Sequence, residues 1–275
     1  MDYSVLMSVY QKEHPEHFRA AIQSMVDQTV SPGEFVLICD GPLTPELESV
    51  IECFCLEYPE WFRVIRLEQN VGLGAALNRG ITECRYEYIA RMDADDIALP
   101  HRMENQLQVF SEHPEVSVIG GQIAEFETDP SQITEYRIVP QTHEDILRKM
   151  KFSNPINHVT AVYRKSRILE AGNYPDHPGF EDYHLWINLA CKGNRFYNLP
   201  EVCCKVRAGG SMLERREGIA YFKQTQKLEQ LLLEKKFLTR WQYYVNLVVR
   251  FGGTVILPAR LRKKIFSKLM RQKQL

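Results

Sequence analysis

The 275-residue sequence lacks the cysteine patterns of a zinc ribbon or a disulfide-rich domain. Its seven cysteines include no Cys-x-x-Cys pair, and several stand in apolar runs, as free buried thiols do. We therefore expect neither a structural zinc site nor a disulfide framework, and we expect a reducing, cytoplasmic location.

Long apolar runs are also missing. The longest candidate, Tyr243–Leu257, is interrupted by Asn246, Arg250 and two glycines, whereas a helix needs about 20 apolar residues to span a bilayer. The N-terminus has neither the basic nor the apolar region of a secretory signal peptide. The sequence thus predicts no membrane span and no cleaved leader.

Acidic residues are absent from Lys235 to Leu275, which hold eleven Lys and Arg, while the rest of the chain has 23 basic against 35 acidic residues. Helical patterns cover Tyr221–Lys236, Thr239–Phe251 and Arg260–Arg271, and the last is basic and amphipathic. Two interpretations stay open: an anchor in the interface of an anionic membrane, or a docked C-terminal helix with solvated lysines. No nucleic-acid recognition module is recognisable, so we expect no nucleic-acid partner.

What the sequence does contain is an alternation of strand and helix patterns, typical of an α/β fold with a mainly parallel, Rossmann-like sheet. The first half predicts strands at Tyr3–Val9, Glu34–Cys39, Arg63–Leu67 and Tyr86–Met92, and helices at His17–Gln28, Pro45–Glu57, Gly72–Cys84 and Pro100–His113. The second half predicts extended segments at Val116–Glu127, Thr134–Ile138, Asn157–Tyr163 and Phe196–Val206, and helices at His143–Lys151, Lys165–Ala171, Asp182–Lys192 and from Met212 towards Phe237.

Each strand of the first half leads into a polar loop. These loops are 11–13, Asp40-Gly41, 70–72 and 93–96. In open α/β sheets ligands bind beyond the carboxyl ends of the strands, so the loops are expected to line one crevice. Gly72-x-Gly74 has no third glycine at the required position, which disfavours a dinucleotide-binding Rossmann site.

The most informative of these loops holds three carboxylates within four positions, Asp93, Asp95 and Asp96. Like charges this close disfavour ionisation unless a cation offsets them, and Mg²⁺ or Mn²⁺ prefers such oxygens. The sequence favours a metal–diphosphate site at Asp93 and Asp95 over an acidic helix cap, and leaves the role of Asp96 undecided.

An ordered set of motifs extends over roughly the first 210 residues: Ser8-Val9-Tyr10, Cys39-Asp40-Gly41, Asn70-x-Gly72-Leu73 with Asn78, Met92-Asp93-Ala94-Asp95-Asp96, and Phe180-Glu181-Asp182 with Trp186. This set resembles the family 2 inverting glycosyltransferases of the GT-A fold, and within them the enzymes of bacterial capsular, exopolysaccharide and O-antigen synthesis. The resemblance implies a domain over 1–210, with a nucleotide-sugar half at 1–98 and an acceptor half at 99–210. We expect residues 211–275 to form a helical C-terminal extension.

For the donor, the resemblance implies contacts to a nucleotide sugar, with UDP as the expected nucleotide. Asp40 corresponds to the acidic residue at the base and ribose, Asn70 and Gly72 face sugar or phosphate oxygens, and Asp95, with Asp93, holds the metal. The other residues expected at the donor are Val9, Tyr10, Glu13, Asn78, Arg91, Ala94, His158, Arg207, Arg215 and Arg216. By position alone, His158 is equally compatible with a core or surface histidine.

For catalysis, the resemblance implies that the acidic pair Glu181-Asp182 supplies the base, with Asp182 preferred. The acceptor is then a saccharide, which can be linked to a polyprenyl diphosphate at the inner face of the cell membrane. The Gln-x-x-Arg-Trp signature of processive synthases is absent, because Phe237 stands where the glutamine should be. That absence favours addition of a single sugar.

Two other functions would suit parts of this sequence. A sugar-nucleotide nucleotidylyltransferase usually has a glycine-rich loop after its first strand, and the corresponding segment here, Tyr10–His14, has no glycine. A non-catalytic membrane adaptor with the same fold would have no need of Asp93, Asp95 and Asp182.

Overall fold

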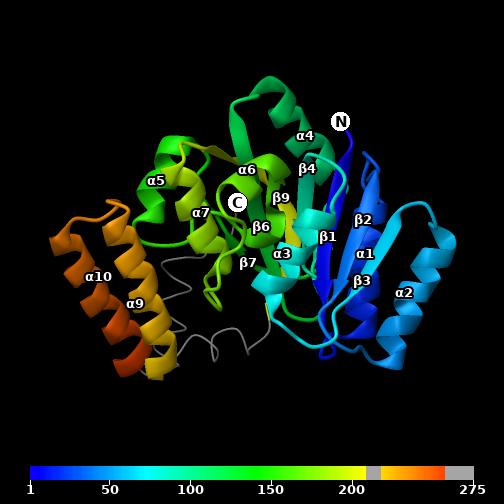
Figure 1. Ribbon diagram of the computed structural model, residues 1–275, viewed down its shortest axis with the longest axis horizontal. Helices are drawn as coiled ribbons and strands as arrows, with labels where there is room; N and C mark the ends of the chain where they lie inside the picture. The colour runs from blue at the N-terminus through cyan, green and yellow to red at the C-terminus, as the bar shows by residue number, and fades with distance from the viewer. Residues whose placement is uncertain (209–217, 258–275) are drawn as a thin grey trace.

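The computed structural model describes residues 1–208 and 218–257, and within them one nine-stranded sheet runs through the molecule. The strand order is β3-β2-β1-β4-β8-β6-β9-β5, with β7 paired to β6 (Figure 1). The strands are β1 (Tyr3–Val9), β2 (Glu34–Cys39), β3 (Phe62–Arg66), β4 (Tyr88–Met92), β5 (Ile97–Ala98), β6 (Val116–Phe126), β7 (Ile133–Arg137), β8 (Val162–Arg164) and β9 (Arg195–Arg207). The predicted α/β class is confirmed.

Strand direction divides the sheet into two parts. The first four strands are parallel, with β1 between β2 and β4. Strand β8 then runs antiparallel to both β4 and β6, while β6 and β9 are parallel to each other. The parallel arrangement thus holds for the first half, and the second half is mixed.

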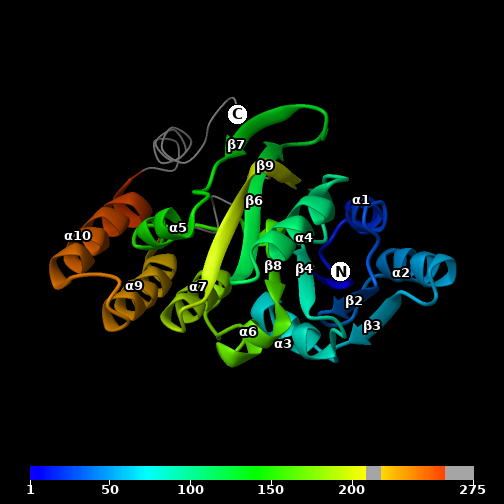
Figure 2. The ribbon, with the colours of Figure 1, turned by 90° about the horizontal axis from the view of Figure 1, so that it is seen from above.

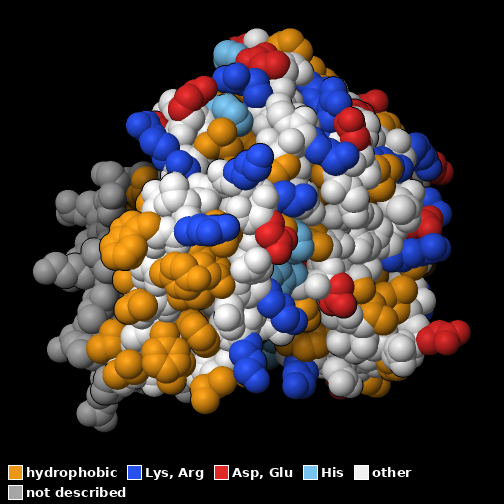
Figure 3. Space-filling model, turned by 60° about the vertical axis from the view of Figure 1, so that its left-hand side comes forward, with side chains coloured by type: hydrophobic (Ala, Val, Ile, Leu, Met, Phe, Trp, Pro, Cys, Tyr) orange, Lys and Arg blue, Asp and Glu red, His pale blue; other side chains and the backbone are white. Residues whose placement is uncertain are grey.

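Helices cover both faces of the sheet (Figure 2). They are α1 (Pro15–Val26), α2 (Pro45–Glu57), α3 (Leu73–Glu83), α4 (Arg102–Glu112), α5 (His143–Met150), α6 (Lys165–Glu170) and α7 (Glu181–Cys191). After residues 209–217, which lie outside the description, come α9 (Gly218–Glu234), α10 (Arg240–Phe251) and a π-helical turn, η2 (Gly252–Ile256). Helices α9 and α10 lie side by side at one end, far from α2, and hydrophobic side chains gather over that end (Figure 3).

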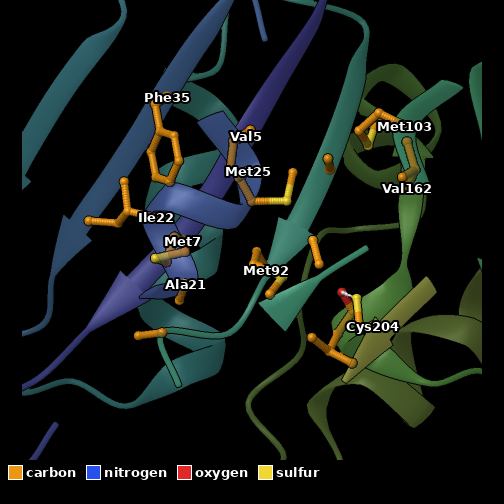
Figure 4. Packing of buried hydrophobic residues seen from close by; sticks show 14 of the residues in the cluster. Val5, Met7, Ala21, Ile22, Met25, Phe35, Met92, Met103, Val162 and Cys204 are labelled. Carbon is orange, nitrogen blue, oxygen red and sulfur yellow. Dashed lines mark hydrogen bonds between the residues drawn. The ribbon is translucent and has the colours of Figure 1, made fainter. Parts of the chain in front are cut away.

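Successive side chains of a strand point to opposite faces of the sheet, so the chain has two hydrophobic cores. Val5 and Met7 of β1 face α1, where they pack with Ile22 and Met25 (Figure 4). Leu6 points to the opposite face and packs with α3, and the approach is so close that a Cβ on Gly80 would lie 2.2 Å from Leu6 Cδ1. Because every residue of β2 is buried, this part of the sheet is covered on both faces, as a parallel sheet requires.

Most predicted elements are present, with ends shifted by a few residues. The strand predicted at Asn157–Tyr163 is wrong: His158–Thr160 form a 3₁₀ turn, η1, and β8 begins only at Val162. Side-chain hydrogen bonds hold this turn in place of the backbone hydrogen bonds of a strand. The Asn157 side chain donates to the carbonyl of Gly121, and the Thr160 hydroxyl accepts from the N–H of Gly121. Strand β5 has only two residues and was not predicted.

The structure bears in different degrees on the predictions about membrane spans, cysteines and the C-terminal helices. In residues 1–208 and 218–257 no helix combines the length and the apolarity that a bilayer crossing requires. All seven cysteines are free. The helix predicted from Met212 is described only from Gly218, and the basic helix predicted at Arg260–Arg271 lies outside the described residues. The division of the chain into 1–98, 99–210 and 211–275 stays a prediction.

Candidate active site

The polar loops predicted to meet do lie at one edge of the sheet. Strands β2, β1 and β4 are adjacent and parallel, so Val9, Cys39 and Met92 end them on the same side. The segments that follow carry Tyr10, Asp40 and Asp93 to this edge. Asp40 is tied to the first loop directly, because its backbone N–H donates to the carbonyl of Val9 at 2.8 Å.

Asp40 organises the start of α3. Its carboxylate is buried and accepts from the backbone N–H groups of Val71 (2.7 Å) and Gly72 (3.1 Å), while the amide of Asn70 donates to the Asp40 carbonyl. Gly72 precedes the helix with a φ of +87°, a conformation that favours glycine. Asp40 therefore has a structural role, and its predicted contact with a nucleotide base would use the remaining lone pairs of the carboxylate.

The acidic loop is organised around Arg91. This guanidinium is only 2% exposed and pairs in bidentate fashion with both carboxylate oxygens of Asp93. The buried Arg91 therefore compensates the negative charge of Asp93. In this conformation the Arg91 side chain holds Asp93 instead of reaching a donor directly.

Asp95 and Asp96 have different surroundings. Burial, together with the nearby Asp93 and Glu13 carboxylates, raises the pKa of Asp95 to about 7. Asp96 is buried, and it accepts a hydrogen bond from the backbone N–H of Arg207 at 2.8 Å. Asp96, undecided from sequence, therefore links the acidic loop to the end of β9.

The residues at this loop fit a divalent cation bound through few protein ligands. No cluster of three or more His, Cys, Asp or Glu positioned for a metal occurs in the described part of the chain. Mg²⁺ and Mn²⁺ sites, however, commonly use one or two carboxylates and complete the shell with water and substrate phosphates. The raised pKa of Asp95 indicates a carboxylate that a cation would stabilise in its ionised form.

The acidic pair of the second half begins α7. The Oδ2 atom of Asp182 accepts from Asn154 Nδ2 at 2.6 Å, and its Oδ1 accepts from the N–H of Tyr183 at 2.7 Å. Burial raises the pKa of both Asp182 and Glu181. Glu181 lies against the first turn of α3, because a Cβ on Gly74 would be 3.3 Å from Glu181 Cβ. The fold thus brings the candidate base beside the loop that starts α3.

Two predicted donor residues instead hold a tyrosine. The Asn78 side chain donates to the carbonyl of Tyr174 and accepts from its N–H, both at 2.7 Å. His158 Nε2 lies 2.7 Å from the Tyr174 hydroxyl, and burial lowers the pKa of this histidine well below its usual value. Asn78 and His158 therefore fasten the segment that leads to Glu181, and direct contact of either with a donor stays a prediction.

The remaining predicted residues are spread along the edge. Tyr10 is exposed, whereas Val9 and Ala94 are buried. The Arg207 guanidinium stacks over Phe126 at 4.7 Å and donates to the carbonyl of Thr128, so it helps to shape the end of β9. Arg215 and Arg216 lie outside the described residues.

Sequence reasoning missed two buried residues that support the site. Tyr174 had no signal beyond its place in a turn-rich segment. The Arg102 guanidinium is 2% exposed, donates to the carbonyl of Arg91 at 2.9 Å and lies 3.3 Å from Met92 Sδ. An arginine in an amphipathic helix pattern is ordinarily assigned to solvent, so only the packing reveals its position beneath the acidic loop.

Comparison with known proteins identifies the relatives of this chain. A family model described as glycosyl transferase family 2 matches residues 4–171. An uncharacterized glycosyltransferase of Haemophilus influenzae is 38% identical over 99% of this chain and 100% of its own length. The amylovoran biosynthesis glycosyltransferase AmsE of Erwinia amylovora is 35% identical over 97% of this chain and 98% of its own. An Escherichia coli UDP-Gal:alpha-D-GlcNAc-diphosphoundecaprenol beta-1,3-galactosyltransferase is 31% identical over 98% and 97%, respectively.

Solved structures support the fold assignment. TarS 1–349 of S. aureus, in complex with UDP-GlcNAc, superposes with a TM-score of 0.68 at 18% identity, covering 98% of this chain and 76% of TarS. The mannosyltransferase PcManGT of Pyrobaculum calidifontis, in complex with GDP-Man and Mn²⁺, gives a TM-score of 0.63 at 14% identity, covering 97% and 79%. The predicted GT-A fold is confirmed.

Proposed function

The chain belongs to glycosyl transferase family 2, and from this premise we propose that it transfers a single hexosyl or N-acetylhexosaminyl group, with inversion, from a nucleotide sugar to a hydroxyl of a saccharide acceptor. UDP is the proposed nucleotide, and cell-surface polysaccharide biosynthesis the proposed process. The named functions of the E. amylovora and E. coli relatives support this choice.

The donor is proposed to lie across the edge formed by β1, β2 and β4. Asp40 contacts the base or ribose, and the N-terminus of α3 faces the diphosphate. The first N–H groups of a helix have no partners within it and favour an anion. The positive φ of Gly72 and the hydrogen bonds from Val71 and Gly72 to Asp40 support this role, because they fix where α3 begins.

Asp95 would hold Mn²⁺ or Mg²⁺, with Asp93 contacting the ribose or a water molecule in the metal shell. When bound, the cation supplies Lewis-acid stabilisation to the charge that accumulates on the departing nucleoside diphosphate. The bidentate pair of Arg91 with Asp93 supports this division of roles, because it compensates the charge of Asp93, while within residues 1–208 and 218–257 Asp95 has no cationic partner at hydrogen-bond distance.

Asp182 is the proposed general base. It removes the proton of the acceptor hydroxyl as the oxygen forms its bond to the anomeric carbon, while the bond from that carbon to the diphosphate oxygen breaks and the electron pair leaves with the nucleotide. The hydrogen bond from Asn154 favours the ionised form that a base requires, whereas burial opposes it. General bases contribute roughly 10²–10⁴ in rate.

The acceptor is proposed to be linked to a polyprenyl diphosphate, which would place the enzyme peripherally on the inner face of the cell membrane. The wording of the E. coli relative's name, a diphosphoundecaprenol acceptor, supports this proposal. The basic residues between Lys235 and Leu275 suit an anionic membrane surface. No nucleic-acid partner is proposed.

The observation that carries the proposal is the approach of Glu181 to Gly74, which joins the acidic pair of α7 to the first turn of α3. Calorimetric titration of UDP, GDP and dTDP, each with Mn²⁺ and with EDTA, tests it. We expect binding of one nucleotide that depends on the metal. If no nucleotide binds in either condition, the donor site is wrong, and the adaptor hypothesis is favoured.

A further inference from the structure

Helix α10 carries an exposed apolar face that no described part of the chain covers. Its most exposed members are Trp241 (76%), Val248 (72%) and Val249 (68%), and the face comprises Trp241, Tyr244, Val245, Val248 and Val249. Their spacing of three and four residues places all five on one side of an α-helix. Figure 3 shows hydrophobic side chains gathered over this end of the molecule.

The opposite face of α10 is firmly attached to the domain. Asn246 donates to Glu229 of α9 (2.9 Å) and to the carbonyl of Lys151 (3.2 Å), and Arg250 pairs with the fully buried Glu229 and donates to the carbonyl of Phe152 (2.8 Å). These contacts fix the rotation of the helix. The apolar face therefore points outward because polar groups on the other side hold it there.

The attached side of α10 is linked to a segment of the candidate active site. Phe152, whose carbonyl accepts from Arg250, is itself 56% exposed, and Phe251 and Ile256 extend the apolar area beyond the face of α10. Asn154, two residues after Phe152, is the residue that donates to Asp182. The segment that positions the proposed base is thus attached to the inner side of α10, across the helix from the apolar face.

From Lys235 onward every Lys, Arg, Asp or Glu in the sequence is a basic residue. Between Arg240 and Leu257 there are two arginines and no acidic residue, and Lys235 and Lys236 are exposed just before the helix. The chain then continues for 18 residues that hold seven Lys and Arg and no Asp or Glu, namely Arg260, Arg262, Lys263, Lys264, Lys268, Arg271 and Lys273. Such a segment favours an anionic partner over the same basic segment of a second copy.

We infer that the outer face of α10 docks on the surface of an anionic lipid bilayer. Valines of the face enter the boundary between headgroups and acyl chains, Trp241 and Tyr244 lie at the headgroup level, and the flanking Lys and Arg meet the lipid phosphates. The inference rests on the proposed function for its use, because a lipid-linked acceptor would lie in the membrane to which the chain is docked.

Binding of the full-length chain to vesicles tests the inference without any catalytic step. Sedimentation with phosphatidylcholine vesicles, with and without phosphatidylglycerol, is compared for the unchanged protein, Val248→Asp and Leu56→Asp. Leu56 is the matched control, because it is 84% exposed on α2, at the opposite end of the molecule. We expect binding that requires phosphatidylglycerol, a loss of about tenfold in Val248→Asp, and no change in Leu56→Asp.

Fluorescence locates the contact on α10. The emission of the chain should shift to shorter wavelength when the anionic vesicles are added, and brominated lipids should quench it, but neither effect should occur in Trp241→Phe. The other two tryptophans contribute little to either signal, because Trp186 is fully buried and Trp61 lies between α2 and β3, at the opposite end of the molecule.

Three outcomes would overturn the inference. They are an absence of vesicle binding by the full chain, equal binding by Val248→Asp and the unchanged protein, and a dimer without lipid that Val248→Asp converts to monomer. The last would assign the face to a second copy of the chain. Loss of nucleotide binding with intact vesicle binding would contradict the proposed function alone, so the two failures are distinguishable.

Discussion

Asn154 donates a 2.6 Å hydrogen bond to Asp182. It lies in the segment between α5 and η1, to which Asn246 and Arg250 of α10 also donate hydrogen bonds. The candidate base is therefore held by a residue far from it in sequence, and through that residue it is joined to the C-terminal helices. The relationship explains how a half-buried carboxylate at the start of a helix keeps a defined orientation. It also leads to the first two predictions.

Replacing Asp182 with Asn should abolish transfer while leaving the donor site intact. We expect kcat to fall by roughly 10²–10⁴, because the acceptor hydroxyl loses its base. The affinity for the metal–nucleotide complex should stay unchanged in calorimetry. Asp176→Asn, an exposed carboxylate in the preceding turn, is the matched control. Transfer at the normal rate in Asp182→Asn would contradict the assignment.

Replacing Asn154 with Ala should move the pH dependence of transfer. The hydrogen bond from Asn154 lowers the pKa of Asp182, against the larger effect of burial, which raises it. Without the bond the pKa rises further, so the acidic limb of the kcat/KM profile should shift to higher pH while activity on the plateau is better preserved. An unchanged limb, with an overall loss of activity, would mean that Asn154 serves only packing.

Replacing Arg91 with Met should be strongly destabilising. The substitution removes a buried guanidinium whose partner Asp93 is 33% exposed and therefore partly solvated, so the cost should lie near the lower end of the roughly 3–5 kcal/mol typical of a fully buried pair. Urea unfolding measures the loss. Arg63→Met breaks the exposed pair with Glu83 and serves as the control, with an expected cost below about 1 kcal/mol. Equal effects of the two substitutions would contradict a buried, coupled role for Arg91.

The sequence predicted the first half of the fold well because its signals are local. Runs such as Glu34–Cys39, which is apolar from Phe35 onward and is followed by Asp40-Gly41, specify buried strands and their ends. The motifs also led to the family. They did not reveal that Asn78 holds Tyr174 or that Asp40 holds Val71, because those bonds join segments distant in the chain.

In the second half, tertiary contacts overrode local preference. Val159, Thr160 and Val162 have high strand propensity, yet Thr160 and Asn157 bond to Gly121 and fold part of the segment into a turn. The two-residue strand β5 exists only because β9 passes beside it. Likewise, the sequence identified aromatic residues in α10, but only the structure separates Tyr243, which is buried, from Tyr244, which is exposed.

A pair of histidines should make the stability of the chain depend on pH. His177 and His184 meet with their Nδ1 atoms 3.2 Å apart, and His177 Nε2 lies 3.1 Å from the carbonyl of Gln224 in α9. If Nε2 donates to that carbonyl, His177 Nδ1 accepts and His184 Nδ1 donates, so both rings are neutral. Burial lowers the pKa of His177, and it lowers that of His184 to about 4.

The sign of the effect follows from these shifts. Both pKa values are lower in the folded chain than in the unfolded chain, so the unfolded state binds more protons as pH falls below about 6.5, and stability is lost from there towards pH 4. Nearby Lys227 and Lys235 act in the same direction, whereas Asp176 opposes it. We expect the Tm of the unchanged protein to fall between pH 7.5 and pH 5. In His184→Asn the fall should be smaller, because one of the two groups no longer titrates. His101, an exposed histidine at the start of α4, provides the control in His101→Asn. If His184→Asn and His101→Asn lose Tm equally on acidification, the pair does not set the pH dependence.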